Sequence, residues 1–313
     1  MKKKWVVLGS AIGISTVVMA TTGITALAGT SGYENYKEAL KNSKTAKSVS
    51  VQAEVVLQDN GTTLNNATGS LKINLTNETA SGTVAIAGQN KKQSLDLFKQ
   101  SNQTVWKASD KDVYYVKSEK KEKKREKNND PNEQDSAWMS KQAETVIDAL
   151  VGNLQNEVVS DKNTDGSEHI SMKLSNAQIP AVLQALAPLA FKQLSENHHE
   201  GKRASDAKEG SAEPDKLLES SLFKPSQLSL TQDIQITNVS LQADIDANNF
   251  IKNQQFSVTF SGKDASSVNH DVTINVNAQL SNYNATTPDT IDLKGKNVQQ
   301  VKNDHGHSFD EQD

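Results

Sequence analysis

Two histidine-containing segments are the residues whose types and spacing could bind a metal ion. His198-His199-Glu200 and His305-Gly306-His307 offer imidazole and carboxylate ligands. Both lie in polar stretches that are poor in hydrophobic residues, and neither has a third ligand fixed nearby in the sequence. Adjacent histidine side chains also project in different directions. We therefore interpret both segments as solvated loops and predict no metal site.

A pair of aspartates, Asp244 and Asp246, could serve as acid and base in a hydrolytic reaction. They alternate with Ala243 and Ile245, so strand periodicity places them on the solvated face of a sheet. The chain contains no G-x-S-x-G, no H-E-x-x-H and no phosphate-cradling glycine loop. It also has no cysteine, which excludes disulfides, thiolate metal sites and cysteine nucleophiles. We predict no catalytic residue, no cofactor and a protein that is not an enzyme.

The charge balance of the chain argues against a nucleic-acid partner. The formal net charge is -4, and Lys2, Lys3 and Lys4 all lie at the extreme N-terminus. A chain without these lysines is more acidic still. Phosphate binding needs a surplus of positive charge on the folded surface. We therefore expect no nucleic-acid partner.

The N-terminal segment, residues 1–28, has the pattern of a targeting sequence. Basic residues precede an uncharged stretch from Trp5 to Ala28, which ends in the small-x-small cleavage pattern Ala26-Leu27-Ala28. This resembles a bacterial Sec signal peptide. The same stretch is long enough to span a bilayer if it is not cleaved. The expected location is extracytoplasmic, either secreted or attached to the outer face of the cytoplasmic membrane.

After the targeting segment, alternating apolar residues predict two series of antiparallel strands. About six strands follow one another between Val49 and Val116, and a second series runs from Gln227 to Tyr283. The polar stretches Asn248-Asn249, Gly262-Lys263-Asp264 and Asn269-His270-Asp271 are predicted turns within the second series. A further strand pair is expected near Glu157 to Ser160 and His169 to Leu174.

Three segments have helical periodicity, because their apolar residues recur at i, i+3 and i+4. They are Tyr33 to Asn42, Ser136 to Gln155 and Ala177 to Ser195. Two polar, charged insertions, 117–135 and 197–215, are expected to be mobile loops of one domain covering residues 33–290. Residues 291–313 are expected to form a polar tail.

These elements predict an α+β fold in which a curved antiparallel sheet forms a half-open β-barrel covered by two to three helices. The element order resembles the periplasmic lipoprotein-carrier fold (LolA-like) and the related lipid-carrier lipoproteins of the LppX type. The resemblance covers roughly Tyr33 to Tyr283, and the chain departs from it in lacking a lipobox cysteine. It implies a non-enzymatic module that shelters acyl chains outside the cytoplasmic membrane.

On this interpretation the ligand lies between the sheet and two of the helices. The expected lining residues are Trp106, Tyr115, Trp138, Ile147, Leu150, Leu183 and Leu186. The alternative is that the aromatic side chains fill a packed core between sheet and helices. The expected partners are a lipid or other apolar ligand and a membrane surface or envelope component. A second hypothesis is a membrane-anchored structural or sensory ectodomain that acts through protein contacts.

Overall fold

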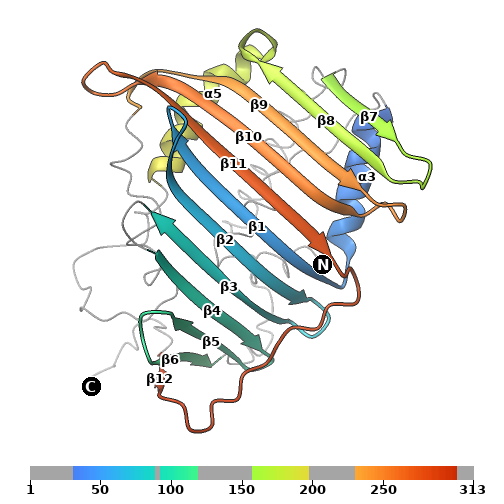
Figure 1. Cartoon of the computed structure of the whole chain (residues 1–313), viewed down its shortest axis with the longest axis vertical. Helices are drawn as coiled ribbons and strands as arrows, with labels where there is room; N and C mark the ends of the chain where they lie inside the picture. The colour runs from blue at the N-terminus through green and yellow to red at the C-terminus, as the bar shows by residue number, and fades with distance from the viewer. Residues whose placement is uncertain (1–30, 89–91, 119–156, 197–229, 302–313) are drawn as a thin grey trace, which may run out of the picture.

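The computed structural model describes residues 31–88, 92–118, 157–196 and 230–301. These residues form one 12-stranded sheet with the strand order β12-β6-β5-β4-β3-β2-β1-β11-β10-β9-β8-β7 (Figure 1). All neighbours in this order are antiparallel except β12 and β6, which are parallel. The sheet is curved and open, since its edge strands β7 and β12 do not meet. The predicted curved antiparallel sheet is therefore confirmed.

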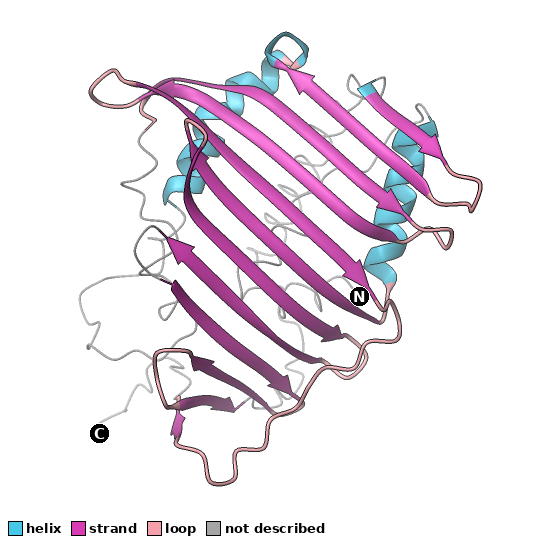
Figure 2. Cartoon of the chain, viewed as in Figure 1, coloured by secondary structure: helices cyan, strands magenta, loops and turns pink. Residues whose placement is uncertain are grey.

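Hairpins account for most of the strands, as the sequence predicts. The strands are β1 Ser48–Asp59, β2 Thr62–Asn74, β3 Thr79–Gly88, β4 Lys92–Gln100, β5 Gln103–Ala108, β6 Tyr114–Ser118, β7 Val158–Lys162, β8 Glu168–Ser175, β9 Gln232–Ile245, β10 Ile251–Lys263, β11 Asn269–Ser281 and β12 Val298–Gln300. The described helices are α3 Ser31–Thr45, the short 3-10 helix η2 Asn176–Gln178 and α5 Ala181–Glu196. Both α-helices lie on the same side of the sheet (Figure 2).

The two predicted series of strands join at β1, which pairs with β2 on one side and with β11 on the other. The β1–β11 register runs from Ser50 opposite Ser281 to Asp59 opposite Val272. The alternation in β1 is clear, because Val49, Val51, Ala53 and Leu57 are buried while Gln52 is exposed. One face of the sheet is thus apolar and carries the helices, and the other face is polar.

A change of parity within β9 marks a β-bulge. Ile234 and Ile236 occupy even positions, whereas Val239, Leu241 and Ala243 occupy odd positions, yet all lie in apolar clusters on the helix side. The register with β10 explains this, because Thr259 pairs with Asn238 while the next residue, Phe260, pairs with Ile236. The extra residue returns the apolar side chains to the same face.

The predicted turn Asn269-His270-Asp271 is wrong, because these residues begin β11. The turn lies just before them, where the Asp264 carboxylate accepts hydrogen bonds from the backbone N–H groups of Ser266 and Val268 at 2.8 Å each. Pairing of these three residues with Lys263, Gly262 and Ser261 of β10 overrides the local turn preference of Asn and Asp. His270 is thereby held in the sheet.

His270 connects the ends of three strands through two carboxylates. Its Nδ1 lies 2.8 Å from Asp59 Oδ2, and its Nε2 lies 3.7 Å from Asp264 Oδ2. The hydrogen bond to Asp59 raises the pKa of His270 above its ordinary value; partial burial lowers it, and the charges of Asp59 and Asp264 raise it further.

The segment after β11 crosses one end of the sheet before it forms β12. Asp289 accepts hydrogen bonds from Lys72 Nζ at 2.9 Å and from Ser81 Oγ at 3.3 Å. The Thr286 Oγ1 atom lies 2.9 Å from Ser50 Oγ, within hydrogen-bond distance. Residues 298–300, within the predicted polar tail 291–313, then pair with β6 (Figure 1). We call residues 282–297 the C-terminal strap.

Several expectations concern residues outside the described ranges. These are the targeting segment 1–28, the helix Ser136 to Gln155, the insertion 197–215, most of the insertion 117–135 and the end of the tail. Lys117 and Ser118, the first two residues of the predicted insertion 117–135, belong to β6. The helix predicted from Ala177 begins instead at Ala181, after η2.

We expect Gly82→Ala to destabilise the fold. A Cβ at residue 82 would lie 2.2 Å from the Ser70 carbonyl oxygen and 2.6 Å from Leu71 Cδ2, so the backbone of β2 or β3 must shift. The expected loss of unfolding free energy is about 2 kcal/mol or more. Urea denaturation measures it, with the exposed Lys92→Ala on the neighbouring strand as control. A Gly82→Ala variant as stable as that control would contradict the close approach of β3 to β2.

We expect the stabilisation by His270 to depend on pH. Because its folded-state pKa is raised, the contribution is complete below the unfolded value of about 6.5 and is lost as the pH rises through the folded value. The difference in unfolding free energy between wild type and His270→Asn should therefore shrink between pH 5.5 and 8.5, a range of about three pH units over which histidine titrates. Asp59→Asn should weaken the same dependence. A difference that is constant with pH would show that the Asp59–His270 pair is not charged.

Candidate ligand-binding face

The apolar face of the sheet divides into three clusters of buried side chains. The α5 cluster consists of Leu57, Leu174, Ile179, Ala187, Phe191, Leu230, Ile236, Phe260 and Val272. The α3 cluster consists of Tyr36, Ala39, Leu40, Ile170, Leu241, Ala243, Ile245 and Ile251. The strand cluster consists of Val49, Val51, Ala53, Leu71, Val84, Ile86, Leu95, Leu97, Trp106, Ala108 and Tyr115.

Helix α5 is fixed to β9 by one polar side chain and by its apolar side chains. Gln184 Nε2 donates to the Ile236 carbonyl at 2.6 Å, and Gln184 Oε1 accepts from the Ile236 N–H at 3.0 Å. The pairing of β8 with β9 ends at Asn238, so this amide replaces a strand partner for Ile236. Phe191 packs edge-on against Phe260 with ring centroids 5.5 Å apart.

Helix α3 is fixed at both ends by hydrogen bonds to the sheet. Near its start, Asn35 Nδ2 donates to the Glu168 carboxylate at 2.8 Å, and Ser160 also bonds that carboxylate. Near its end, Ser43 Oγ accepts from the buried Ile251 N–H at 3.0 Å. Tyr283 donates to the Ile251 carbonyl at 2.6 Å, and burial raises the pKa of Tyr283 to about 12.

The strand cluster differs from the other two because all its members belong to strands β1 to β6. Its partly buried neighbours come from strands, from the C-terminal strap and from other loops; Tyr283 belongs to the strap, and Val301 follows β12. At its centre Trp106 and Tyr115 stack with ring centroids 6.2 Å apart. Their side chains are 1% and 7% exposed, so both rings are buried. No described helix contributes a member to their cluster.

The structure brings together two of the predicted ligand-binding residues. Trp106 and Tyr115 are in contact within the strand cluster, whereas Leu183 is partly buried against the α5 cluster. Trp138, Ile147 and Leu150 lie outside the described residues. The stacked pair and Leu183 therefore belong to different parts of the apolar face.

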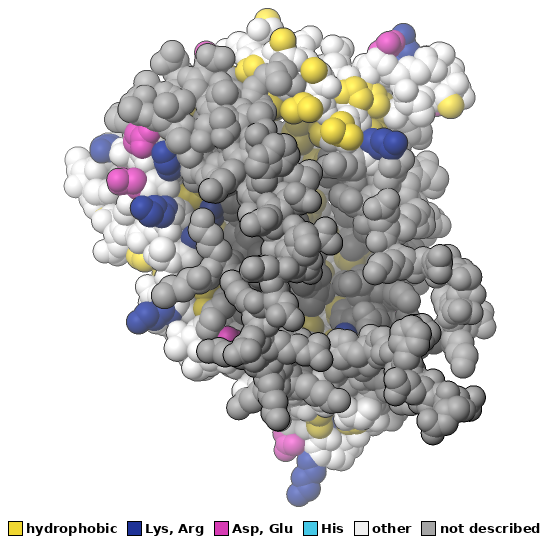
Figure 3. Space-filling model, turned by 180° about the vertical axis from the view of Figure 1, so that it is seen from behind, with side chains coloured by type: hydrophobic (Ala, Val, Ile, Leu, Met, Phe, Trp, Pro, Cys, Tyr) yellow, Lys and Arg dark blue, Asp and Glu magenta, His cyan; other side chains and the backbone are white. Residues whose placement is uncertain are grey.

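Leu186 does not lie at the contact between helix and sheet, contrary to the expectation that helix α5 buries it. It is 41% exposed, and Leu189 is 54% exposed. The buried side of α5 consists of Leu183, Ala187 and Phe191, which are spaced by four residues. Because the helix is apolar over most of its circumference, its sequence does not indicate which side faces the sheet. Figure 3 shows exposed hydrophobic side chains toward the top of this face, the part where Figure 1 places α5.

Sequence reasoning missed Gln184, which positions α5. It is the only polar residue between Ala181 and Phe191, and a single amide in an apolar helix was the sequence signal that could have indicated a docking role. An amide in an otherwise apolar helix face is stable when both its donor and its acceptor are satisfied.

The aspartate pair considered for catalysis divides between two structural roles. Asp244 accepts from His169 at 2.7 Å and from Asn253 at 2.9 Å. Burial opposes ionisation of Asp244, but these hydrogen bonds outweigh burial and lower its pKa. Asp246 instead accepts the N–H groups of Asn248 and Phe250 in the β9–β10 turn, at 2.9 Å each.

Two further findings concern the described residues. No group of three or more His, Asp or Glu side chains among them is arranged to hold a metal ion. None of their helices combines the length and the hydropathy needed to cross a bilayer.

Comparison with known proteins adds a weak structural likeness. No protein-family model and no curated protein matches this chain. Among solved structures, it is similar to a DUF1329 family protein from Desulfovibrio piger, with 7% identity and a TM-score of 0.19. That alignment covers 80% of this chain and 90% of the other. A TM-score this low does not establish a shared fold.

We expect Gln184→Leu to destabilise the protein, because it leaves the N–H and carbonyl of Ile236 without a partner while keeping similar side-chain volume. The expected loss of unfolding free energy is about 2–3 kcal/mol. Leu186→Gln is the matched control, since the exposed Leu186 contributes little burial and its replacement should cost about 0.5 kcal/mol or less. Urea denaturation compares the two. Equal losses would show that α5 does not dock through Gln184.

Proposed function

We propose that this protein is an exported, non-enzymatic module that binds a lipid or other apolar ligand at the cell envelope. The observation that carries the proposal is the strand cluster, a broad buried apolar surface to which the described helices contribute no member. Its members are at most 7% exposed, so an acyl chain that binds there must take the place of side chains now packed on them. An acyl chain is a suitable cover, since each methylene removed from water contributes about 0.8 kcal/mol before the costs of binding.

The Trp106–Tyr115 pair is the proposed centre of the ligand contact. Stacked aromatic rings give a flat apolar surface with few rotatable bonds, so little side-chain entropy is lost when a chain packs on them. Val84, Leu95 and Leu97 extend this surface along β3 and β4. All five side chains are uncharged, which suits the hydrocarbon part of a lipid.

A second candidate function is a membrane-attached ectodomain that acts through protein contacts. The exposed Leu186 and Leu189 on α5 favour it, because paired apolar side chains on a helix surface are typical of contact sites. This candidate predicts that the protein works through α5, whereas the lipid-binding proposal depends on the strand cluster. Substitutions in the two regions therefore distinguish the two functions.

The test uses Trp106 as a reporter of ligand contact. The chain has three tryptophans, at positions 5, 106 and 138, so a form that starts at Gly29 and carries Trp138→Phe keeps only Trp106. A brominated fatty acid quenches tryptophan fluorescence only at close range. We expect it to quench Trp106 emission strongly, and the unbrominated fatty acid to bind without quenching.

The control for this experiment replaces exposed residues on α5. Leu186→Ser with Leu189→Ser should leave the quenching unchanged, because both residues lie outside the strand cluster. Native mass spectrometry establishes binding independently of fluorescence. Binding without quenching would place the ligand elsewhere, and absence of any fatty-acid binding would refute the lipid proposal.

A further inference from the structure

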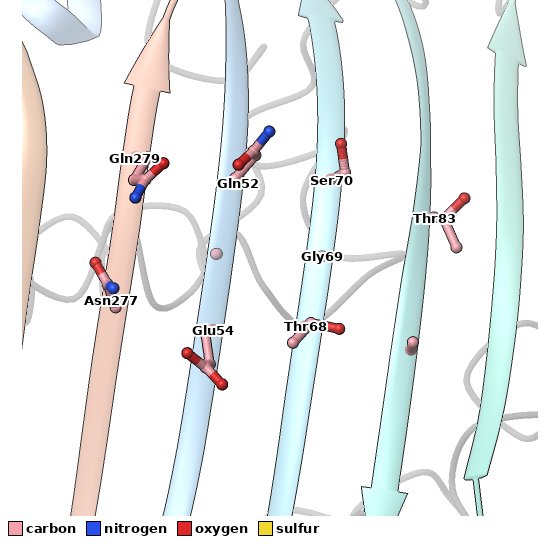
Figure 4. Close-up of a pocket in the computed structure, with 10 residues that line it drawn as sticks. Gln52, Glu54, Thr68, Gly69, Ser70, Thr83, Asn277 and Gln279 are labelled. Carbon is pink, nitrogen blue, oxygen red and sulfur yellow. The ribbon is translucent and has the colours of Figure 1, made fainter.

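The polar face of the sheet contains two hollows that meet. The first, of about 390 Å³, is lined by residues of β11, β1, β2 and β3 (Figure 4). The second, of about 400 Å³, is lined by residues of β1 and β9 to β11. Glu54 and Asn277 line both hollows, and these two residues are cross-strand partners. The hollows are therefore two halves of one depression, which we call the polar groove.

Uncharged polar side chains dominate the polar groove. Among the described residues that line either hollow, Glu54 is the only charged one, although 23% of the residues in the chain are charged. The solvated face of an antiparallel sheet commonly carries charged side chains. The nearby Lys72, at the edge of the groove, is neutralised by Asp289 of the C-terminal strap at 2.9 Å. No described residue that lines the groove is a cation, and the exposed Lys173 lies opposite Ser240 in the β8–β9 register. Glu54, at the junction of the two hollows, would repel a phosphate polymer or nucleic acid.

The side chains of the polar groove form rows across the sheet. One row contains Thr68, Glu54, Asn277, Gln255 and Gln242, which are successive cross-strand partners. Strand spacing separates neighbours in a row by about 4.8 Å. Each row therefore presents a regular series of hydrogen-bonding groups perpendicular to the strands, extending over five of them.

A second row lies one pleat further along the same strands. It contains Thr83, Ser70, Gln52 and Gln279, and Figure 4 shows these side chains on the same face as Glu54. The Gln52 and Gln279 side chains are exposed and make no hydrogen bond with another described residue. Each amide offers one acceptor and two donors to a ligand.

Glu54 is oriented at the junction of the two hollows. Asn66 Nδ2 donates to Glu54 Oε1 at 2.8 Å, so one carboxylate oxygen is held while the other has no hydrogen bond with a described residue. A carboxylate oxygen accepts two hydrogen bonds, an arrangement that suits neighbouring hydroxyl groups. The centre of the groove is thus an acceptor between rows of amides.

We propose that the polar groove binds an uncharged polysaccharide, whose hydroxyl and acetamido groups match the amides and hydroxyls of the two rows. Neutral glycans are long, rich in both donors and acceptors, and free of the negative charge that Glu54 excludes. The volumes of the two hollows together suit a ligand of several sugar units. This site lies on the face opposite the strand cluster, so it stands independently of lipid binding.

The experiment measures binding of a chitin hexasaccharide to the protein by isothermal titration calorimetry, with cellohexaose and polyglycerol phosphate as comparison ligands. We expect the hexasaccharides to bind and the phosphate polymer not to bind. Gln52→Ala with Gln279→Ala should raise the Kd about tenfold, since two hydrogen-bonding amides are lost. Thr68→Arg should abolish binding by filling the first hollow with a bulky charged side chain.

Gln235→Ala is the matched control, because Gln235 is an exposed amide on β9 that lines neither hollow. It should leave the Kd unchanged, and thermal melting should show all variants folded. The proposal is overturned if neither hexasaccharide binds, if the Gln52→Ala, Gln279→Ala double variant and Gln235→Ala bind equally well, or if polyglycerol phosphate binds more tightly than the sugars. The first two results would identify the groove as a solvated sheet face only, and the third would show that the protein prefers a phosphate polymer.

Discussion

The structure depends on covering one apolar face of an open sheet. An antiparallel sheet places successive side chains on opposite faces, so twelve paired strands produce an apolar surface far larger than one helix can cover. Helix α3 contacts β7, β9 and β10, and α5 contacts β9, so both serve the same half. The other half consists of the strand cluster. This division between a half packed by helices and a half formed by strands is the physical basis of the proposed ligand site.

The polar contacts at the helices determine where that division falls. Gln184 attaches α5 at the bulge in β9, where the β8–β9 pairing has ended and backbone groups need partners. Ser43 and Asn35 attach α3 to the buried Ile251 N–H and to Glu168. Because an unpaired buried backbone group is costly, these bonds favour one position for each helix over sliding along the sheet. Apolar packing alone would not select that position.

Much of the sheet could be predicted from the sequence, because period-two alternation is strong in segments such as Val49 to Leu57 and Val272 to Leu280. The start of β11 could not, since Asn269-His270-Asp271 has the composition of a turn and only its pairing with residues 261–263 of β10 makes it a strand. The buried side of α5 could not be predicted either, because leucine and alanine occupy nearly every side of that helix. Trp106 and Tyr115 were identified individually, but their stacking depends on the β5–β6 register.

The polar groove shows why register matters more than composition on this face. Gln52, Glu54, Asn277 and Gln279 read in the sequence as ordinary solvated positions of two strands more than 200 residues apart. The β1–β11 register places Gln52 opposite Gln279 and Glu54 opposite Asn277, which converts scattered amides into continuous rows. A register shifted by one residue would move these side chains to the helix side and bury them among valines and leucines. The burial of the apolar face thus fixes the register, and the register in turn builds the groove on the opposite face.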